Sequence, residues 1–182
     1  RLQIAHFIFF DPFQIFMSSW LDVALLAVLI VLNGVFAMSE ISLVTSRRAR
    51  LQRLIDDKVA GAERARELNA DPNRALSTIQ VGITSIGILS GIVGESALAR
   101  PMEAFLVMVG LSPETAKAIG LFVVVVLITY FSIVMGELVP KRIGQISPER
   151  IACRLAPPIH CLSIIAAPFV KLLSASTHLL LK

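Results

Sequence analysis

Three long runs without a charged side chain restrict the fold of this chain more than any other feature. They cover 23–39, 75–94 and 118–136. A helix of about 20 apolar residues is long enough to cross the hydrocarbon core of a bilayer. The composition agrees, because 55% of the residues are hydrophobic and only 16% are charged, whereas a soluble domain carries about 25% charged residues. We therefore predict an all-α membrane protein with three transmembrane helices, at about 21–46, 75–98 and 116–139.

The segment after Pro140 is harder to assign. Pro157, Pro158, Pro168 and Lys171 interrupt its apolar sequence, and proline removes a helical hydrogen bond. The uninterrupted pieces are about 10 to 12 residues long, a length typical of interfacial or re-entrant helices. We expect 140–182 to form juxtamembrane helices and not a fourth crossing.

Positive charges concentrate in two segments. Eight of the seventeen Lys and Arg residues, including Arg47 and Arg48, lie in 47–74, and four more, including Lys141, lie in 141–154. The positive-inside rule places both segments in the cytoplasm and the N-terminus outside. Leu51, with apolar residues at 54, 55 and 59, predicts an amphipathic helix on the membrane surface in the first basic segment.

The first nineteen residues are expected to be an N-terminal extension or an interfacial segment, because 1–16 lack the small-residue cleavage site of a signal peptide. No repeat or domain boundary divides 20–182, which we predict to be one transmembrane domain. The expected surroundings are a lipid bilayer, with no nucleic-acid partner.

Two carboxylates lie at the ends of apolar runs, Glu40 after the first and Glu137 after the third. An ionised carboxylate is costly there unless it is paired, hydrated or bound to a cation. Pro140 cannot donate to the Gly136 carbonyl four residues earlier, so an unpaired backbone oxygen is expected beside Glu137. Carboxylates and backbone oxygens at helix breaks hold cations in transporters.

The alternative is simple charge pairing. Glu137 precedes Lys141 by four residues and Arg142 by five, so a salt bridge at the membrane surface would also explain it. Arg47 or Lys141 could neutralise Glu40 in the same way.

The second apolar run carries a polar stripe. Small and hydrogen-bonding residues recur every three or four positions along one helical face, at Ser77, Gln80, Thr84, Gly87, Gly91 and Gly94. The glycines favour close helix packing, since Gly87 and Gly91 form a GxxxG pair. Gln80 and Thr84 add oxygen atoms and are better candidates for a binding site, although hydrogen bonds between helices would also explain them.

The available ligands are hard oxygen atoms, which suit magnesium, calcium, sodium or protons and not zinc or copper. None of the three histidines falls in an apolar run, so soft-metal transport and Ser-His catalysis are disfavoured. The sequence also lacks a P-loop. We predict that the chain is not an enzyme.

A resemblance to a known family rests on three segments, which read NGVFAMSEISLVTSRRARL at 33–51, LSTIQVGITSIGILSGIVGESALA at 76–99 and VMGELVPKRIG at 134–144. Together they are similar to the transmembrane domain of the CNNM/CorC family, which is implicated in magnesium efflux. The G-E-x-x-P-K block is the most specific of the three.

The resemblance implies a homodimer, with three transmembrane helices and a juxtamembrane belt in each subunit. It implies a dehydrated Mg²⁺ between the helices, export coupled to Na⁺ entry, and residence in the bacterial inner membrane. A cytoplasmic CBS-domain pair that binds nucleotide normally follows such a domain, and it would begin where this chain stops. Nucleotide regulation is therefore not expected of this segment.

Residue by residue, the resemblance places Glu137, Gly136 and Glu40 at the ion site, with Pro140 as the helix break and Lys141 beside it. Asn33, Gly34 and Gly82 match packing positions. Two departures weaken the ligand set. Magnesium-binding members often have a serine where this chain has Ala37, and asparagines where it reads ITSIG at 83–87. Ser39, Gln80, Thr84 and Ser85 are the possible substitutes.

Three functions follow as hypotheses. The first is secondary transport of magnesium, and the second is transport of another hard cation. The third is a membrane scaffold or regulatory subunit without transport activity.

Overall fold

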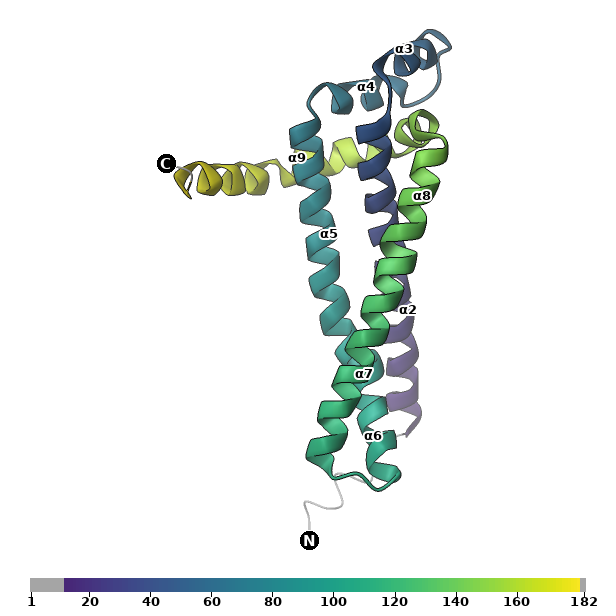
Figure 1. Cartoon of the computed structure of the whole chain (residues 1–182), viewed down its shortest axis with the longest axis vertical. Coiled ribbons are helices and arrows are strands. Elements are labelled where there is room, and N and C mark those ends of the chain that lie inside the picture. Colours follow the sequence, from purple (N-terminus) through teal and green to yellow (C-terminus); the bar gives the residue numbers. More distant parts are fainter. Residues whose placement is uncertain (1–11, 181–182) are drawn as a thin grey trace. The chain divides into compact units, whose positions relative to one another are not determined.

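The computed structural model describes residues 12–180, and in this range every element is a helix. The elements in chain order are α2 (Pro12–Thr45), α3 (Arg48–Asp56), α4 (Ala62–Ala70), α5 (Pro72–Gly94), the π-helical turn η1 (Glu95–Ala99), α6 (Arg100–Met108), α7 (Pro113–Ile133), the π-helical turn η2 (Val134–Leu138), α8 (Val139–Ile146) and α9 (Pro148–Leu180). Figure 1 shows their course. The predicted all-α fold is confirmed. Of the predicted segment 1–19, residues 1–11 lie outside the described range, and the remainder belongs to α2.

Proline marks the start of the long helices. Residues Pro72, Pro113 and Pro148 open α5, α7 and α9. Proline suits a first helical position, since its fixed φ is already helical and its missing N–H would have no partner there. Asp71 and Ser112 precede two of these prolines and accept hydrogen bonds from the backbone N–H of the residue three positions later. These caps explain where α5 and α7 begin.

Contacts divide the chain into two compact units, of which unit 1 comprises Arg1–Val31 and Gly87–Ser132. Within unit 1, α6 and α7 are joined by a turn at Gly110, whose φ of +104° is readily adopted only by glycine. Gly120 of α7 packs against α6, since a Cβ atom there would lie 3.3 Å from the Glu103 nitrogen.

Unit 2 comprises Leu32–Ile86 and Ile133–Lys182 and contains all the predicted ligand residues of the candidate site. Its apolar core joins the end of α2, the start of α5 and the short helices α3 and α4 to one face of α9. The buried members are Leu43, Leu51, Ala62, Ala65, Leu68, Ala75, Ile79, Ala152, Cys153, Ala156 and Ile159. Small residues dominate the list, so these helices approach closely.

The first basic segment forms two short helices, α3 and α4, and not the single amphipathic helix that was predicted. Leu51 is fully buried against the protein core and not on a membrane-facing side, and Val59 is 40% exposed. The chain reverses between the helices, with positive φ at Lys58 and Gly61. A Cβ at Gly61 would collide with the Cys153 carbonyl of α9. The contact with α9 thus overrides the helical periodicity of the sequence.

The prediction that prolines break the last segment is wrong, because α9 is one helix from Pro148 to Leu180. A proline inside a helix costs about 3 kcal/mol or more. Here the residues of α9 that face the core hold the helix together. The Cys153 carbonyl has no helical donor because residue 157 is proline, and Gly61 lies against this carbonyl. Tertiary packing therefore offsets the proline cost.

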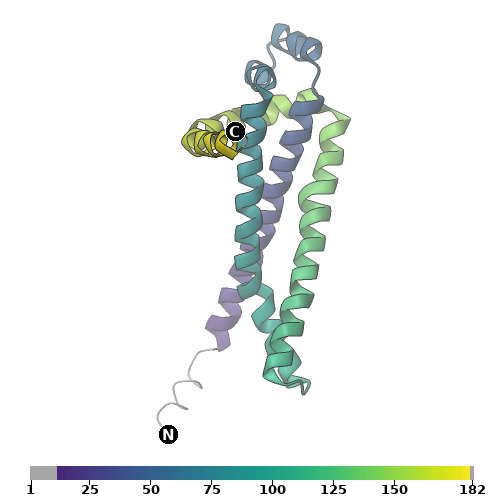
Figure 2. The same ribbon diagram turned by 60° about the vertical axis from the view of Figure 1, so that its left-hand side comes forward.

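Within residues 12–180, four helical stretches, where three were predicted, are long and apolar enough to cross a membrane. They are Trp20–Thr45, Pro72–Met108, Pro113–Ile146 and Pro148–Thr177. The second and third contain their predicted spans, and the first matches its predicted span except for Ser46. Within unit 2, however, Figures 1 and 2 show α9 running crosswise to the start of α5 and the end of α2. This orientation favours a helix that lies along the membrane surface.

Candidate functional site

A π-helical turn, η2, carries the motif that the sequence singled out. The Val139 N–H donates to the Val134 carbonyl five residues earlier, which widens the helix at Gly136 and Glu137. The helix continues through Pro140 into α8, so Pro140 widens the helix without breaking it. Single π turns inside helices are frequent at functional sites, because they expose backbone groups and redirect side chains.

The Gly136 carbonyl has a partner on α2. The Asn33 side-chain amide donates to this oxygen over 3.0 Å and replaces the N–H that Pro140 lacks. The Oδ1 atom of Asn33 is buried and accepts no hydrogen bond from any described residue. The Asn33 amide thus satisfies the Gly136 carbonyl with its N–H group, while its own Oδ1 atom has no hydrogen-bond partner.

Close approach of α2 to η2 and α8 depends on small residues. A Cβ at Gly34 would lie 2.9 Å from Pro140 Cγ and 3.3 Å from the Met135 carbonyl oxygen. Gly144 meets α2 in the same way, and its carbonyl accepts a hydrogen bond of 3.4 Å from Ser42 Oγ. The region around Glu137 is therefore fixed to the last turns of α2.

Lys141 joins the two predicted carboxylates. Its Nζ atom lies 2.7 Å from Glu137 Oε1 and 3.2 Å from Glu40 Oε2. The Lys141 side chain is 32% exposed, that of Glu40 29% and that of Glu137 46%. Because both contacts share one nitrogen, the two carboxylates lie within reach of one small cation. The pairing alternative that the sequence left open for Glu40 and Glu137 is thus the arrangement present in the structure.

The cluster of Glu40, Glu137 and Lys141, hereafter the cation triad, carries a net charge of about −1 when all three groups are ionised. No group of three or more His, Cys, Asp or Glu side chains suited to a metal occurs among the described residues. A metal at the triad would therefore need water, backbone or neutral oxygen ligands in addition to the two carboxylates.

The predicted neutral ligands are distributed over two helices. Ser39 is buried on α2, and its hydroxyl donates to the Val35 carbonyl over 2.7 Å. Gln80, Thr84 and Ser85 are exposed on α5, and no hydrogen bond links them to the triad in the described chain. Their participation in a site remains a prediction.

The other packing residues on α5 divide into two groups. A Cβ at Gly82 would lie 2.9 Å from the Phe36 ring, so this glycine accommodates α2. Gly87 and Gly91 have nothing within 4 Å of such a Cβ. Their side of α5 is open in the single chain.

Two polar residues that the sequence analysis did not single out position the ends of these helices. The buried Glu149 carboxylate accepts a hydrogen bond from the Arg47 N–H over 3.3 Å and lies 3.7 Å from Arg50 Nη1. Asn69 donates to the Leu43 carbonyl over 2.9 Å near the end of α2. Each of these bonds joins segments that are far apart in the sequence, so spacing within the sequence could not predict them. Arg47 and Arg48 themselves have exposed positions.

Comparison with known proteins gives a consistent result. Residues 24–182 match the family described as the cyclin M (CNNM) transmembrane N-terminal domain. The UPF0053 protein sll0260 of Synechocystis is 43% identical over 89% of this chain and 36% of its own length. The UPF0053 protein YhdT of Bacillus subtilis is 33% identical over 86% of this chain and 34% of its own length.

A third relative, named polyamine export protein, comes from Escherichia coli. It is 31% identical over 78% of this chain and 32% of its own length. This chain therefore spans about a third of the length of the curated relatives it matches. The family match and the long apolar helices identify an integral membrane protein, and the chain belongs to the CNNM transmembrane-domain family.

Proposed function

We propose that this chain is the membrane part of a secondary transporter that exports Mg²⁺, with Na⁺ entry as the coupled flux. The observation that carries the proposal is the cation triad, in which two carboxylates from different helices hold one ammonium group. A site that holds an internal cation between two carboxylates can also hold a transported one.

A divalent cation in place of the Lys141 ammonium would balance the charge of the two carboxylates better. Two carboxylates balance one Mg²⁺, whereas they leave a net negative charge around one ammonium. Magnesium prefers six oxygen ligands at about 2.1 Å. The Gly136 carbonyl, the unpaired Asn33 Oδ1 and water lie among the groups that could complete the set. We infer that Lys141 leaves the carboxylates as Mg²⁺ enters.

The sidedness follows from charge. With both basic segments in the cytoplasm, the triad lies toward the cytoplasmic ends of α2 and η2, and the N-terminus is outside. This arrangement suits a site that loads Mg²⁺ from the cytoplasm of a bacterium across its inner membrane.

Transport is tested with the purified chain in liposomes that enclose a magnesium-sensitive dye. Glu137→Gln keeps the side-chain shape and removes its charge, and we expect it to abolish the flux driven by a Mg²⁺ gradient. Glu63→Gln, an exposed position on α4, is the matched control and should transport normally. Unchanged flux in Glu137→Gln would reject the site. Absence of both flux and Mg²⁺ binding in the unmodified chain would favour the scaffold hypothesis.

A second candidate substrate is an alkyl diammonium ion. It is favoured by the triad, where a primary ammonium already sits 2.7 Å and 3.2 Å from two carboxylate oxygens, and by the relative named polyamine export protein. Competition separates the candidates. If putrescine displaces Mg²⁺ in a calorimetric titration and is itself transported, the substrate class is organic; if calcium competes better than either, it is another hard cation.

We further propose that the chain is a homodimer and that the open glycine face of α5 contributes to its interface. Exposed Gln80 and Thr84 share this face with Gly87 and Gly91, and such groups are poorly suited to lipid. Gly87→Leu should produce monomers in detergent, as measured by light scattering. Ala27→Leu, at an exposed alanine of α2, is the control. A dimer that persists in Gly87→Leu would exclude this face.

A further inference from the structure

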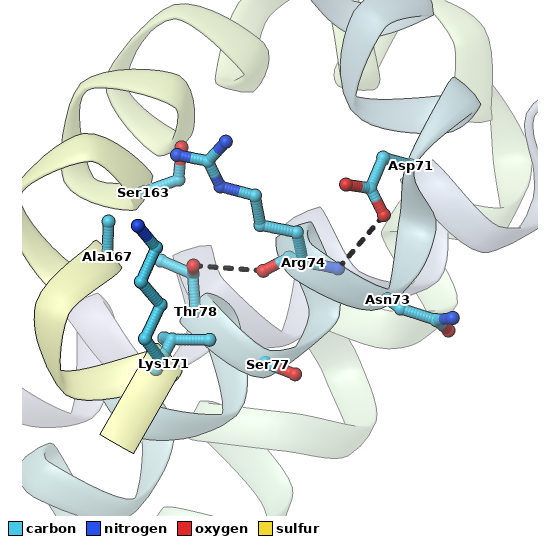
Figure 3. Close-up of a pocket in the computed structure, with 9 residues that line it drawn as sticks. Asp71, Asn73, Arg74, Ser77, Thr78, Ser163, Ala167 and Lys171 are labelled. Atoms are coloured by element: carbon cyan, nitrogen blue, oxygen red, sulfur yellow. Dashed lines mark hydrogen bonds between the residues drawn. The ribbon is translucent and has the colours of Figure 1, made fainter. Parts of the chain in front are cut away.

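A pocket of about 490 Å³ lies in unit 2 between the start of α5 and the middle of α9. Arg74 and Thr78 line it from α5, and Ser163, Ala167, Val170 and Lys171 line it from α9. Figure 3 shows the Arg74 guanidinium extending toward Ser163, and the Lys171 ammonium directed to the same side of the pocket. Two cationic groups from different helices therefore share one cavity.

Neither cation is neutralised within the described chain. The side chains of Arg74 and Lys171 form no ion pair or hydrogen bond with another described residue. Of the nearby acidic groups, Asp71 itself lines the pocket, whereas Glu67 does not and pairs with Arg64. Asp71 accepts a hydrogen bond from the Arg74 backbone N–H over 3.4 Å at the start of α5. Glu67 lies 2.8 Å from Arg64, whose hydrogen bond lowers the pKa of the Glu67 carboxyl below its ordinary value.

The remaining polar groups of the pocket add to its preference for an anion. Thr78 and Ser163 donate their hydroxyl protons to the carbonyls of Arg74 and His160. The charged donors that remain are the guanidinium and the ammonium, beside the neutral side chains of Asn73 and Ser77. A guanidinium binds a phosphate through paired N–H groups, and a lysine adds a compact positive charge. The start of α5 supplies a further partial positive charge.

An apolar surface continues from these charges along α9, within the same unit. Phe169, Leu172 and Leu173 flank Lys171 on this helix and are 51%, 62% and 43% exposed. A cationic end followed by an exposed apolar face matches a phospholipid, whose phosphate is followed by acyl chains. A free phosphate ion would not use the apolar face.

We propose that Arg74 and Lys171 bind the phosphate of an anionic phospholipid, whose acyl chains lie along the exposed apolar residues of α9. Basic pockets between helices at the cytoplasmic side of a membrane recognise such headgroups. A lipid held here contacts α5 and α9 together and stabilises their packing.

The test measures binding of phosphatidylglycerol to the purified chain in neutral detergent by native mass spectrometry. Arg74→Gln/Lys171→Gln is expected to lose about tenfold or more in affinity, because each cation near a headgroup contributes about a factor of five. Arg48→Gln/Arg53→Gln removes the same charge from exposed positions of α3 and should change affinity less than threefold. The melting temperature without lipid establishes that both variants are folded.

Three results would overturn the proposal. Equal losses of affinity in the two double variants would mean that the lipid is attracted by the positive surface in general and not by this pocket. Unchanged affinity in Arg74→Gln/Lys171→Gln would place the lipid elsewhere. Displacement of the lipid by millimolar inorganic phosphate or glycerol phosphate, with no preference for the acylated form, would make the pocket a site for a soluble anion. The proposal is supported if the lipid stays bound in excess phosphate and if only the Arg74→Gln/Lys171→Gln variant loses this binding.

Discussion

The Asn33 amide donates to the Gly136 carbonyl from a position 103 residues earlier in the chain, over 3.0 Å. It supplies to Gly136 the N–H that Pro140 lacks, so this carbonyl is satisfied by a side chain of another helix. The bond also fixes η2, with Glu137 on it, to α2, where Glu40 is located. The cation triad thus depends on a residue that belongs to none of its three charged groups.

We predict that Asn33→Ala lowers stability by about 1–3 kcal/mol, because a buried carbonyl is left without a donor. For a chain of this size the melting temperature should fall by about 2–4 °C per kcal/mol. Thermal unfolding in detergent measures the loss. Gln145→Ala, at an exposed position of α8, is the control and should melt like the unmodified chain. Equal melting temperatures for both variants would show that the bond contributes nothing.

Gly34 and Gly87 are both helical glycines, yet their substitution by alanine is expected to have opposite effects. Alanine at Gly34 would place its Cβ 2.9 Å from Pro140 Cγ, and such overpacking costs about 1–3 kcal/mol. Alanine at Gly87 meets nothing within 4 Å and gains helix propensity of about 0.8–1 kcal/mol. Melting curves of the two variants should therefore shift in opposite directions when both are measured on the monomer, in which the proposed dimer face of Gly87 is open. A stabilising Gly34→Ala would contradict the close approach of α2 and Pro140.

Much of the fold and part of the site could be predicted from local chemistry. The apolar runs located the first three long helices, and Pro140 identified the carbonyl of Gly136 as the one that loses its helical donor. Such conclusions rest on spacing within one helix, where the geometry is nearly fixed.

The partners of these groups could not be predicted, because they come from distant segments. Asn33 was assigned to packing, and its bond to Gly136 spans two helices. The continuity of α9 through Pro157 depends on Gly61 and the core around Cys153. From the sequence, either Arg47 or Lys141 could pair with Glu40. The structure shows that Lys141 is the partner, because α2 and α8 lie side by side.

Lys141→Met should raise the affinity for Mg²⁺ if the ammonium competes with the transported ion. Removing a positive charge about 3 Å from both carboxylates favours a divalent cation by several kcal/mol at intermediate dielectric, so we expect a gain of tenfold or more. Calorimetric titration with Mg²⁺ measures the affinity. Arg142→Met removes an exposed charge one residue away and should change affinity only slightly. Weaker binding in Lys141→Met would mean that the lysine supports the site and does not compete for it.

The contact between Gly61 and α9 can be tested through the two cysteines. Cys153 is 2% exposed, whereas Cys161 is exposed, so a maleimide should label Cys161 in the folded chain and Cys153 only after denaturation. In a Cys161→Ser background, Gly61→Ala should speed the labelling of Cys153, because the added Cβ collides with the Cys153 carbonyl at a backbone φ of +79° that disfavours alanine. Gly87→Ala in the same background should leave the rate unchanged. Rapid labelling of Cys153 before any substitution would indicate that α9 breaks at its prolines.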